Sequence, residues 1–292
     1  MLEIFTGLVT GFFNQLINDV QQSVAGSVET YLLSTHDLSA MQPRPLTDEP
    51  ALQAMYHLML AMGDLLLALV FIYSFLRSQW EHTSFRPHYT LKVMLPRAMA
   101  AIVMAHFALL FGQMAIDLNN AMIHAVWTQP FPGGPPALPW LFVLQNGFGQ
   151  PLFELLVRLA IAVMLVIVAF TYVVRFALLA ILLAVSPLAA LCMILPETKL
   201  YARSWLRLFL LTVFMQFGQV VVLRFASLFA DQIGPRPLEA LYAIAVLYLM
   251  IKVPGLMNAS AHLELKAEHL GEGAVKKAVK GVVGTARTAR AS

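Results

Sequence analysis

The sequence predicts an all-α, polytopic helical membrane protein, and three observations lead to that prediction. Of its 292 residues, 59% are hydrophobic and only 12% are charged. The mean hydropathy is +0.73. Soluble domains are about 45–50% apolar and about 25% charged, so an ordinary soluble enzyme is excluded. Several apolar runs also approach the roughly 20 residues that a helix needs to cross a bilayer.

The first 50 residues predict an amphipathic helix followed by a linker. Over residues 4–33, apolar residues such as Phe5, Leu8, Phe12 and Leu16 recur at steps of three and four. The opposite face is acidic and amidic, which favours packing against partners or sister subunits over a plain interfacial anchor. Residues 34–50 contain three prolines and predict a linker. We expect residues 1–50 to lie outside the membrane on its external side.

Five spans are expected after the linker and form a transmembrane helical bundle over residues 51–253. They cover approximately residues 51–76, 97–126, 154–174, 205–230 and 238–253. The apolar run 176–195 is ambiguous, because it follows Arg175 without a loop and is interrupted at Ser186-Pro187. It predicts either a Pro-broken re-entrant segment or a sixth span.

The distribution of charge predicts the orientation of these spans. Lys and Arg concentrate on the cytoplasmic side of membrane proteins. Segment 77–97 carries four basic residues near the span ends, whereas 127–151 has no charged residue. Lys199, Arg203 and Arg207 also favour the inside, and a full crossing at 176–195 would force them outside. A re-entrant hairpin broken at Pro187 agrees with every basic cluster, and six spans remain the alternative.

The two ends of the chain carry opposite charge. Residues 1–50 hold six acidic residues against one arginine, a balance of −5. From Lys252 onward, seven basic residues face three glutamates, a balance of +4. We therefore expect an external N-terminus and a basic cytoplasmic tail over 254–292. The tail is expected to contact anionic lipid through Lys276, Lys277, Lys280, Arg287 and Arg290.

The second predicted span has one polar face along its whole length. Its members fall within about 40° of one line on the helix surface at 100° per residue; they are His106, Gln113, Asp117, Asn120 and His124. This face predicts either the wall of a hydrated conduit or proton path, or interhelical hydrogen bonding. The sequence leaves both interpretations open.

Asp64 is a candidate buried charge in the middle of the first predicted span, with His57 on the same face. An ionised group in hydrocarbon is unfavourable by about 2.5–3.5 kcal/mol on insertion scales, so a charge partner is expected. Arg158 and Arg224 are the candidates, and Asp64 is then either part of a structural ion pair or a protonatable site that moves in function.

Two further polar groupings are expected to be satisfied within the protein. Glu154 precedes Arg158 by four residues, which predicts an ion pair on one helix face. Gln216, Gln219 and Arg224 share a broad face of the fourth span and are expected to face neighbouring helices.

Enzyme motifs fail or are absent in this sequence. An aspartyl intramembrane protease requires Gly-x-Gly-Asp, and the corresponding residues are Ala61-Met62-Gly63-Asp64. No phosphate-binding loop, His-Glu-x-x-His or Gly-x-Ser-x-Gly occurs. The single cysteine, Cys192, makes redox chemistry improbable. We expect no catalytic residue, cofactor or metal site.

The stretch from Arg175 to Thr198, with Trp205 and the Gln216-x-x-Gln219 helix after it, resembles the central region of TrbL-type polytopic inner-membrane subunits of type IV secretion and conjugation systems. In that family an arginine ends one span, a proline follows about a dozen residues later, and a short loop with Pro and Trp leads to the next long helix. Arg175, Pro187, Pro196 and Trp205 match these positions.

This resemblance implies a subunit of an inner-membrane channel complex that is homo-oligomeric, contacts other secretion-system subunits including cytoplasmic ATPases, and helps DNA or protein to pass outward. Transient contact with translocated DNA is part of that implication. The alternative is a proton- or ion-coupled secondary transporter, in which Asp64, Asp117 and His124 would carry the coupling ion. Transporters commonly show paired broken helices, and only one broken segment is visible in this sequence.

Overall fold

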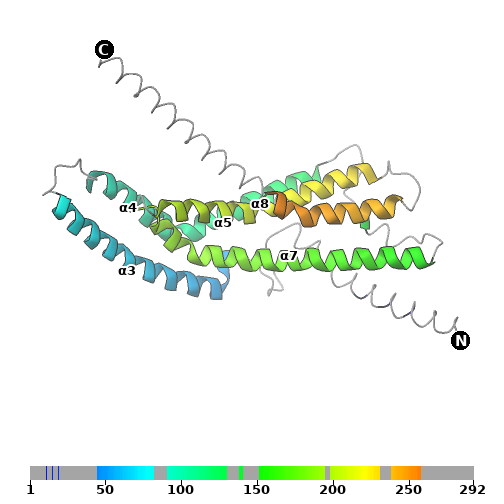
Figure 1. Ribbon diagram of the computed structural model, residues 1–292, viewed down its shortest axis with the longest axis horizontal. Helices are drawn as coiled ribbons and strands as arrows, with labels where there is room; N and C mark the ends of the chain where they lie inside the picture. The colour runs from blue at the N-terminus through cyan, green and yellow to red at the C-terminus, as the bar shows by residue number, and fades with distance from the viewer. Residues whose placement is uncertain are drawn as a thin grey trace, which may run out of the picture. The chain divides into compact units, whose positions relative to one another are not determined.

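The computed structural model in Figure 1 describes residues 45–81, 91–129, 138–140, 151–194, 198–230 and 238–257, together with Gly11, Gln15 and Asp19. The chain divides into two compact units, Met1–Ile251 and Lys252–Ser292. Gly11, Gln15 and Asp19 are helical and exposed. The rest of the amphipathic helix predicted for 4–33, and the basic residues of the tail, lie outside the described residues.

The predicted fold class is confirmed, because every regular element in the described ranges is a helix. The elements are the 3-10 turn η2 (Leu46–Asp48) and helices α3 (Pro50–Glu81), α4 (Leu91–His106), α5 (Ala108–Thr128), α7 (Pro151–Leu191) and α8 (Lys199–Ala230), followed by a last helix at Leu238–Met257. Within the described ranges, four helices are long and apolar enough to cross a membrane, and the bent pair α4–α5 raises the number to five if it counts as one span.

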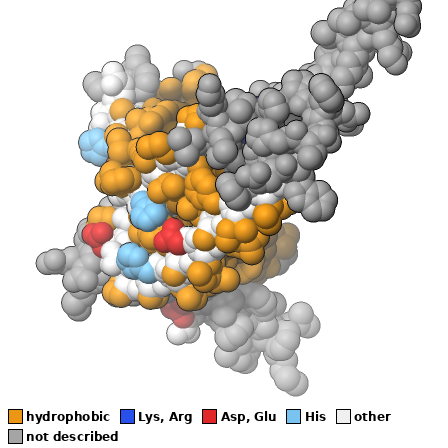
Figure 2. All heavy atoms as spheres, turned by 90° about the vertical axis from the view of Figure 1, so that its left-hand side faces the viewer, with side chains coloured by type: hydrophobic (Ala, Val, Ile, Leu, Met, Phe, Trp, Pro, Cys, Tyr) orange, Lys and Arg blue, Asp and Glu red, His pale blue; other side chains and the backbone are white. Residues whose placement is uncertain are grey.

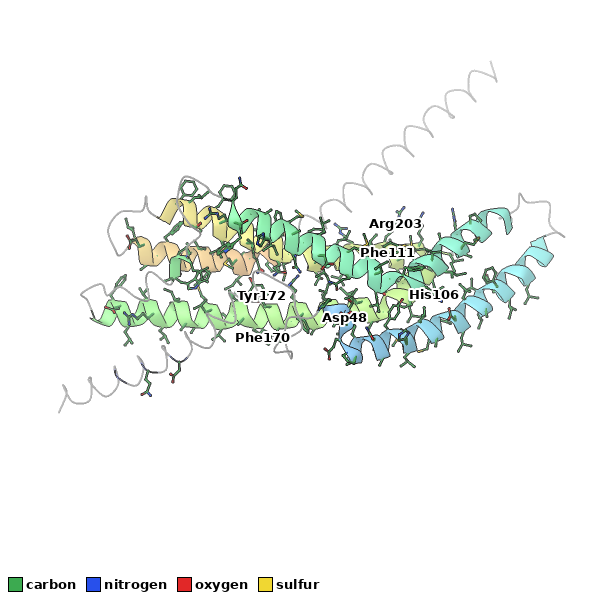
Figure 3. The ribbon with its side chains drawn as sticks, turned by 180° about the vertical axis from the view of Figure 1, so that it is seen from behind. Asp48, His106, Phe111, Phe170, Tyr172 and Arg203 are labelled. Carbon is green, nitrogen blue, oxygen red and sulfur yellow. The ribbon has the colours of Figure 1, made fainter. Side chains whose placement is uncertain are left out.

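Helix α7 is the axis around which the first unit packs (Figure 1). Its first half shares an apolar cluster with the end of α5, the second half of α8 and the last helix, centred on Ile161, Leu165 and Leu223. Its second half joins η2, the middle of α5 and the first half of α8. At its C-terminal end a third cluster contains residues of α3 and α4. In Figure 3, Phe170 of α7 points away from the other helices, whereas Tyr172 points between them.

The end of the predicted linker is part of the packed core. Leu46 in η2 is only 1% exposed, and Thr47 is also buried. The Thr47 hydroxyl donates a hydrogen bond to Oε1 of Gln113 on α5 at 2.9 Å. The prolines of segment 34–50 predicted a linker, and within it the apolar Leu46 anchors η2 against α5 and α7.

The second predicted span, 97–126, is bent by 64° at Phe107, between α4 and α5. Tyr56 of α3 explains where the helix breaks. Its hydroxyl contacts two carbonyl oxygens at the end of α4, that of Ala105 at 2.6 Å and that of His106 at 3.0 Å. A side chain that captures helical carbonyls interrupts the backbone ladder and produces a kink. The prediction of one straight helix here is therefore wrong.

The predicted hairpin at Pro187 is also wrong, because α7 is continuous from Pro151 to Leu191 and includes this proline. Proline lacks an N–H and leaves the carbonyl four residues earlier without its helical donor. That carbonyl, of Leu183, accepts a hydrogen bond from the Ser186 hydroxyl at 2.6 Å. The adjacent Leu182 carbonyl accepts one from the Trp205 indole N–H at 3.2 Å. The Ser186 hydroxyl thus satisfies the carbonyl that Pro187 leaves without a donor, and the helix continues to Leu191. The Trp205 contact links the same turn of α7 to α8.

Candidate functional site

The polar side chains of α8 join three helices inside the bundle. Gln216, Gln219 and Arg224 are all buried, which confirms the prediction that they face neighbouring helices. Gln216 Oε1 accepts a hydrogen bond from Asn119 Nδ2 of α5 at 3.2 Å. Gln219 Nε2 donates to the carbonyl of Met250 in the last helix at 3.1 Å. Hydrogen bonds from this face of α8 therefore join α8 to α5 and to the last helix.

Arg224 closes the same face near the end of α8. Its guanidinium donates to the carbonyl of Gln129, just after α5, at 2.9 Å and to the Ser227 hydroxyl at 3.2 Å. Arg224 is only 2% exposed, in agreement with its interpretation as a buried charge. The expected pairing with Asp64 is not seen, because Arg224 is buried inside the bundle whereas Asp64 is exposed on α3.

Asn119 is a buried polar residue that the sequence interpretation missed. It is fully buried against α8, whereas the neighbouring Asn120 was assigned to the polar face. The two positions lie 100° apart on the helix, so only one of them can follow a given line. Asn119 Oδ1 and Gln219 Oε1 are buried without a hydrogen-bond partner. In the sequence, Asn119 is marked only as a second amide next to Asn120. That signal does not show which of the two side chains faces the interior of the bundle.

Arg175 clamps the middle of α7 to the middle of α8. Its Nε donates to the carbonyl of Thr212 at 2.9 Å, and its Nη2 donates to the carbonyl of Val213 at 3.3 Å. The side chain is 5% exposed. Hydrogen bonds from a charged donor are roughly twice as strong as neutral ones, which makes this contact an interhelical link. Arg175 therefore lies within a continuous helix and does not end a span.

The outward polar face of α5, which we define as Gln113, Asp117, Asn120 and His124, differs from this interior set. Asp117 and His124 are exposed, and Gln113 and Asn120 are partly exposed. Gln113 Nε2 donates to Asp117 Oδ1 at 2.7 Å. The fifth residue of the predicted stripe, His106, is separated from the others by the bend and lies at the end of α4 (Figure 3). Continuity of the stripe through His106 is therefore lost.

Asp64 is not a buried charge in the single chain. Its side chain is exposed on α3, as is that of His57. Arg158 pairs instead with Glu154 at 2.5 Å, which confirms the predicted pair one turn apart. The surface view in Figure 2 shows acidic and histidine side chains interspersed among hydrophobic ones. The expectation of an Asp64–arginine pair is wrong because each arginine is engaged elsewhere.

The positions that carry the family resemblance have structural roles near the end of α7. Trp205 bonds the Leu182 carbonyl and stacks on Phe209, with ring centroids 5.5 Å apart and ring planes inclined by 7°. Pro187 lies inside α7, as described above. Pro196 and the predicted basic tail, Lys276, Lys277, Lys280, Arg287 and Arg290, lie outside the described residues.

Two further findings concern reactive and metal-binding groups. Partial burial raises the pKa of the Cys192 thiol, which follows α7, so that the thiol form is favoured at neutral pH. Across the described ranges, no three His, Cys, Asp or Glu side chains are grouped so that they could hold a metal ion. The described residues therefore provide hydrogen bonds between helices in the interior and a polar face on the outside of α5.

Comparison with known proteins identifies a family. A family model described as conjugal transfer protein TrbL matches residues 1–288. Neither the curated proteins nor the solved structures give a match. The match extends over nearly the whole chain and includes the Arg175–Trp205 region.

Proposed function

Because this chain belongs to the TrbL family of conjugal transfer proteins, we propose that it assembles with further copies of itself and with other transfer-system subunits to help DNA or protein substrate cross the inner membrane. Family membership makes it a component of a conjugal transfer system. The channel role, the inner-membrane location and the contact with ATPases are parts of this proposal. We propose a structural role for it and no catalytic one.

The observation that supports this proposal is the outward polar face of α5. Helix α5 belongs to the bent pair that is apolar enough to cross a membrane, yet Asp117 and His124 are exposed on it. An ionised group facing lipid is unfavourable by about 2.5–3.5 kcal/mol. Asp64 and Asp117 together would therefore destabilise a lone chain in hydrocarbon by about 5–7 kcal/mol. Coverage by another subunit, or contact with water, removes most of this penalty.

The apolar surface supports assembly in the membrane as well. The outward faces of α3 and α7 carry large exposed hydrophobic side chains, among them Leu65, Leu69 and Phe170. These faces suit lipid or the apolar side of a neighbouring subunit. A polar strip next to apolar surfaces is the pattern of a helix that lines an inner passage while its flanks meet lipid and sister subunits. Copies arranged around the outward polar face of α5 would enclose a hydrated path.

The experiment is cysteine accessibility in cells that carry the complete transfer system. In a Cys192→Ser background, single cysteines replace Asp117 or His124 on the outward polar face of α5. The matched control is Phe170→Cys, which is 67% exposed on the apolar side of α7. A charged, water-soluble thiol reagent should modify the two α5 positions and lower the DNA transfer frequency, while it leaves the Phe170 position unmodified.

Two other results would contradict the proposal in different ways. Cross-linking between copies at Asp117→Cys without modification by the reagent would show a subunit contact from which water is excluded. Helix α5 would then hold subunits together and would not form the wall of a conduit. Modification of all three cysteines with unchanged transfer would show that the polar face lines no part of the substrate path.

A further inference from the structure

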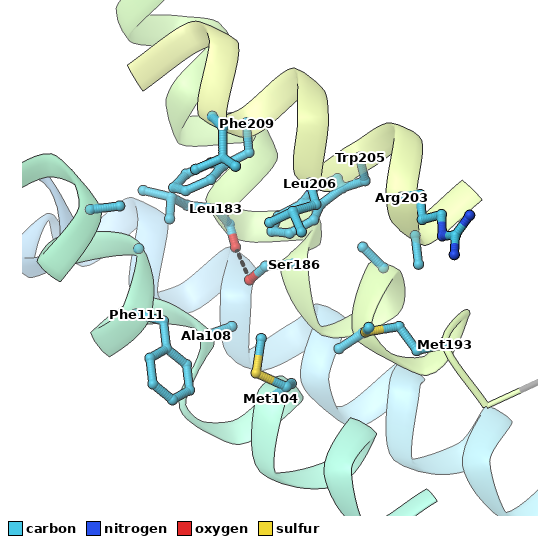
Figure 4. A pocket seen from close by; sticks show the side chains of 16 residues that line it. Met104, Ala108, Phe111, Leu183, Ser186, Met193, Arg203, Trp205, Leu206 and Phe209 are labelled. Atoms are coloured by element: carbon cyan, nitrogen blue, oxygen red, sulfur yellow. Dashed lines mark hydrogen bonds between the residues drawn. The ribbon is translucent and has the colours of Figure 1, made fainter. Parts of the chain in front are cut away.

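Helices α4, α5, α7 and α8 enclose a cavity of about 210 Å³ within the described part of the chain (Figure 4). The cavity exists because small side chains meet where these helices come together. Ala108 and Gly112 of α5, Ala189 and Ala190 of α7 and Ala202 of α8 line it. The 64° bend at Phe107 also turns α4 away from α5 next to this position.

Apart from Arg203 at its edge, the polar side chains that line the cavity already have hydrogen-bond partners and leave no group to hold water. Its hydroxyl, that of Ser186, donates to the Leu183 carbonyl at 2.6 Å, and its indole N–H, that of Trp205, donates to the Leu182 carbonyl at 3.2 Å. A buried water needs two to four polar partners. An apolar cavity of about 150 Å³ stays dry and accepts small apolar ligands, so this larger one suits a hydrocarbon occupant.

The rim of the cavity is apolar on the membrane side and basic at one edge. Met104, Phe111, Leu206 and Leu210 line it and are about 40% exposed, so hydrocarbon can reach the interior between them. Arg203 lies at the edge with its guanidinium turned outward, away from Leu183 and Phe209 (Figure 4). The rim thus combines an apolar entrance with a cation.

The charge next to the rim is consistently positive. Lys199, Arg203 and Arg207 follow one another at four-residue steps at the start of α8, and of these three only Arg203 lines the cavity. No acidic residue lies in the first turn of this helix. An arginine at the level of lipid headgroups binds phosphate through two parallel N–H donors. An anionic headgroup is therefore favoured at this edge over a zwitterionic one.

We propose that the cavity binds part of one acyl chain of an anionic phospholipid, whose phosphate group contacts Arg203. The chain enters past the apolar rim and fills the space beside Ala189 and Gly112. The headgroup remains at the membrane surface, near the start of α8. This bound lipid fills the gap between α5, α7 and α8 and thereby supports the packing of the bent α4–α5 pair against α7.

The experiment is native mass spectrometry of the full-length protein, released from nanodiscs that contain equal amounts of phosphatidylglycerol and phosphatidylcholine with the same acyl chains. The wild-type protein should retain phosphatidylglycerol preferentially. Ala189→Phe fills the cavity and should abolish retention of both lipids. Arg203→Gln leaves the cavity open and should lower the phosphatidylglycerol-to-phosphatidylcholine ratio about fivefold, the factor expected from one basic residue near anionic lipid.

Each variant has a matched control on the same helix. Ala177→Phe adds the same ring at an exposed position of α7, and Lys199→Gln removes one exposed charge of α8 outside the cavity. Both should retain lipid within twofold of wild type. Equal losses in Arg203→Gln and Lys199→Gln would show general attraction to a basic surface and overturn the proposal. Unchanged lipid retention in a folded Ala189→Phe variant would also overturn the proposal. So would a wild-type protein that retains no lipid and in which a side chain of a second copy can be cross-linked inside the cavity.

Discussion

Substitution of Gly112 by alanine tests how tightly α5 packs against α7. A Cβ atom added at Gly112 would lie 2.2 Å from Cδ2 of Leu183, 3.7 Å from Cγ of the same residue and 3.8 Å from Cζ of Phe209. Two carbon atoms need about 3.5 Å. The end of the Leu183 side chain must therefore move by about 1.3 Å, whereas the other two contacts are already acceptable.

The magnitude depends on whether Leu183 has space to move. In a fully packed core an extra methyl group is destabilising by about 1–3 kcal/mol. Leu183, however, lines the 210 Å³ cavity and can turn into it. A strained rotamer costs about 0.5–1.5 kcal/mol, and alanine is more stable than glycine inside a helix by about 0.5–1 kcal/mol. We therefore expect the free energy of unfolding to change by less than about 1 kcal/mol.

The assay is unfolding by sodium dodecyl sulfate in mixed micelles, followed by the loss of helical circular dichroism. The matched control is Gly63→Ala in α3, where the new Cβ would lie 3.1 Å from Cδ1 of Leu191, so that a small shift suffices. Combining Gly112→Ala with Ala189→Phe removes the space that Leu183 needs, and the double variant should lose at least about 1 kcal/mol beyond the sum of the single effects. A loss above about 3 kcal/mol for Gly112→Ala alone, or additivity within about 0.5 kcal/mol, would refute the reasoning.

Further predictions concern polar groups and topology. Asp64→Asn should leave DNA transfer near normal, because Asp64 is exposed and outside the interior links; lost transfer with intact assembly would instead favour ion coupling at this residue. Glu154→Gln should lower the free energy of unfolding by less than about 1 kcal/mol, since the pair with Arg158 is partly exposed. A double-mutant cycle on Asn119→Leu and Gln216→Leu should give a coupling of about 0.6–1.7 kcal/mol, and zero coupling would show that their hydrogen bond contributes nothing. Reporters fused before residue 1 and after residue 292 should lie on opposite sides of the membrane.

Composition and periodicity predicted the helical class, the helices that contain four of the five expected spans and the inward face of α8, because these depend on local sequence. Hydropathy identifies a helix of bilayer length without knowledge of its neighbours. Likewise, Gln216, Gln219 and Arg224 share one helix face, and polar groups on one face of a span turn toward protein. The structure confirms that this face of α8 points toward neighbouring helices. It also shows the hydrogen-bond partners, which are far away in the sequence.

The features that the sequence did not predict are set by side chains from distant segments. The bend at Phe107 depends on Tyr56, about 50 residues earlier, whose hydroxyl captures the carbonyls of Ala105 and His106. The link between the Pro187 turn of α7 and the start of α8 is made by Trp205, 23 residues away from the Leu182 carbonyl that it bonds. A proline in an apolar run predicts a break on local grounds, but the hydroxyl of the adjacent Ser186 satisfies the carbonyl that Pro187 leaves without a donor.

The continuous α7 also removes the conflict that led to a predicted hairpin. In the sequence, a separate crossing at 176–195 would have placed Lys199 and its neighbours outside. In the structure, residues 151–191 form one helix of about 60 Å at 1.5 Å per residue, so a single crossing connects the uncharged segment 127–151 with Lys199. Five crossings then agree with the basic clusters of segment 77–97, of α8 and of the tail, provided that the bent pair α4–α5 crosses the membrane.

The bent pair therefore decides the topology, and two internal reporters separate its two possible arrangements. If α4 and α5 cross as one broken span, a reporter inserted after residue 135 lies outside, opposite to one inserted after residue 85, and the two chain ends lie on opposite sides. If the pair is re-entrant, the reporters at 85 and 135 lie on the same side, four crossings remain, and both chain ends share a side. The uncharged segment 127–151 and the −5 and +4 balances at the chain ends favour the first arrangement. Chain ends on the same side would refute the five-span model and place the outward polar face of α5 in a re-entrant element.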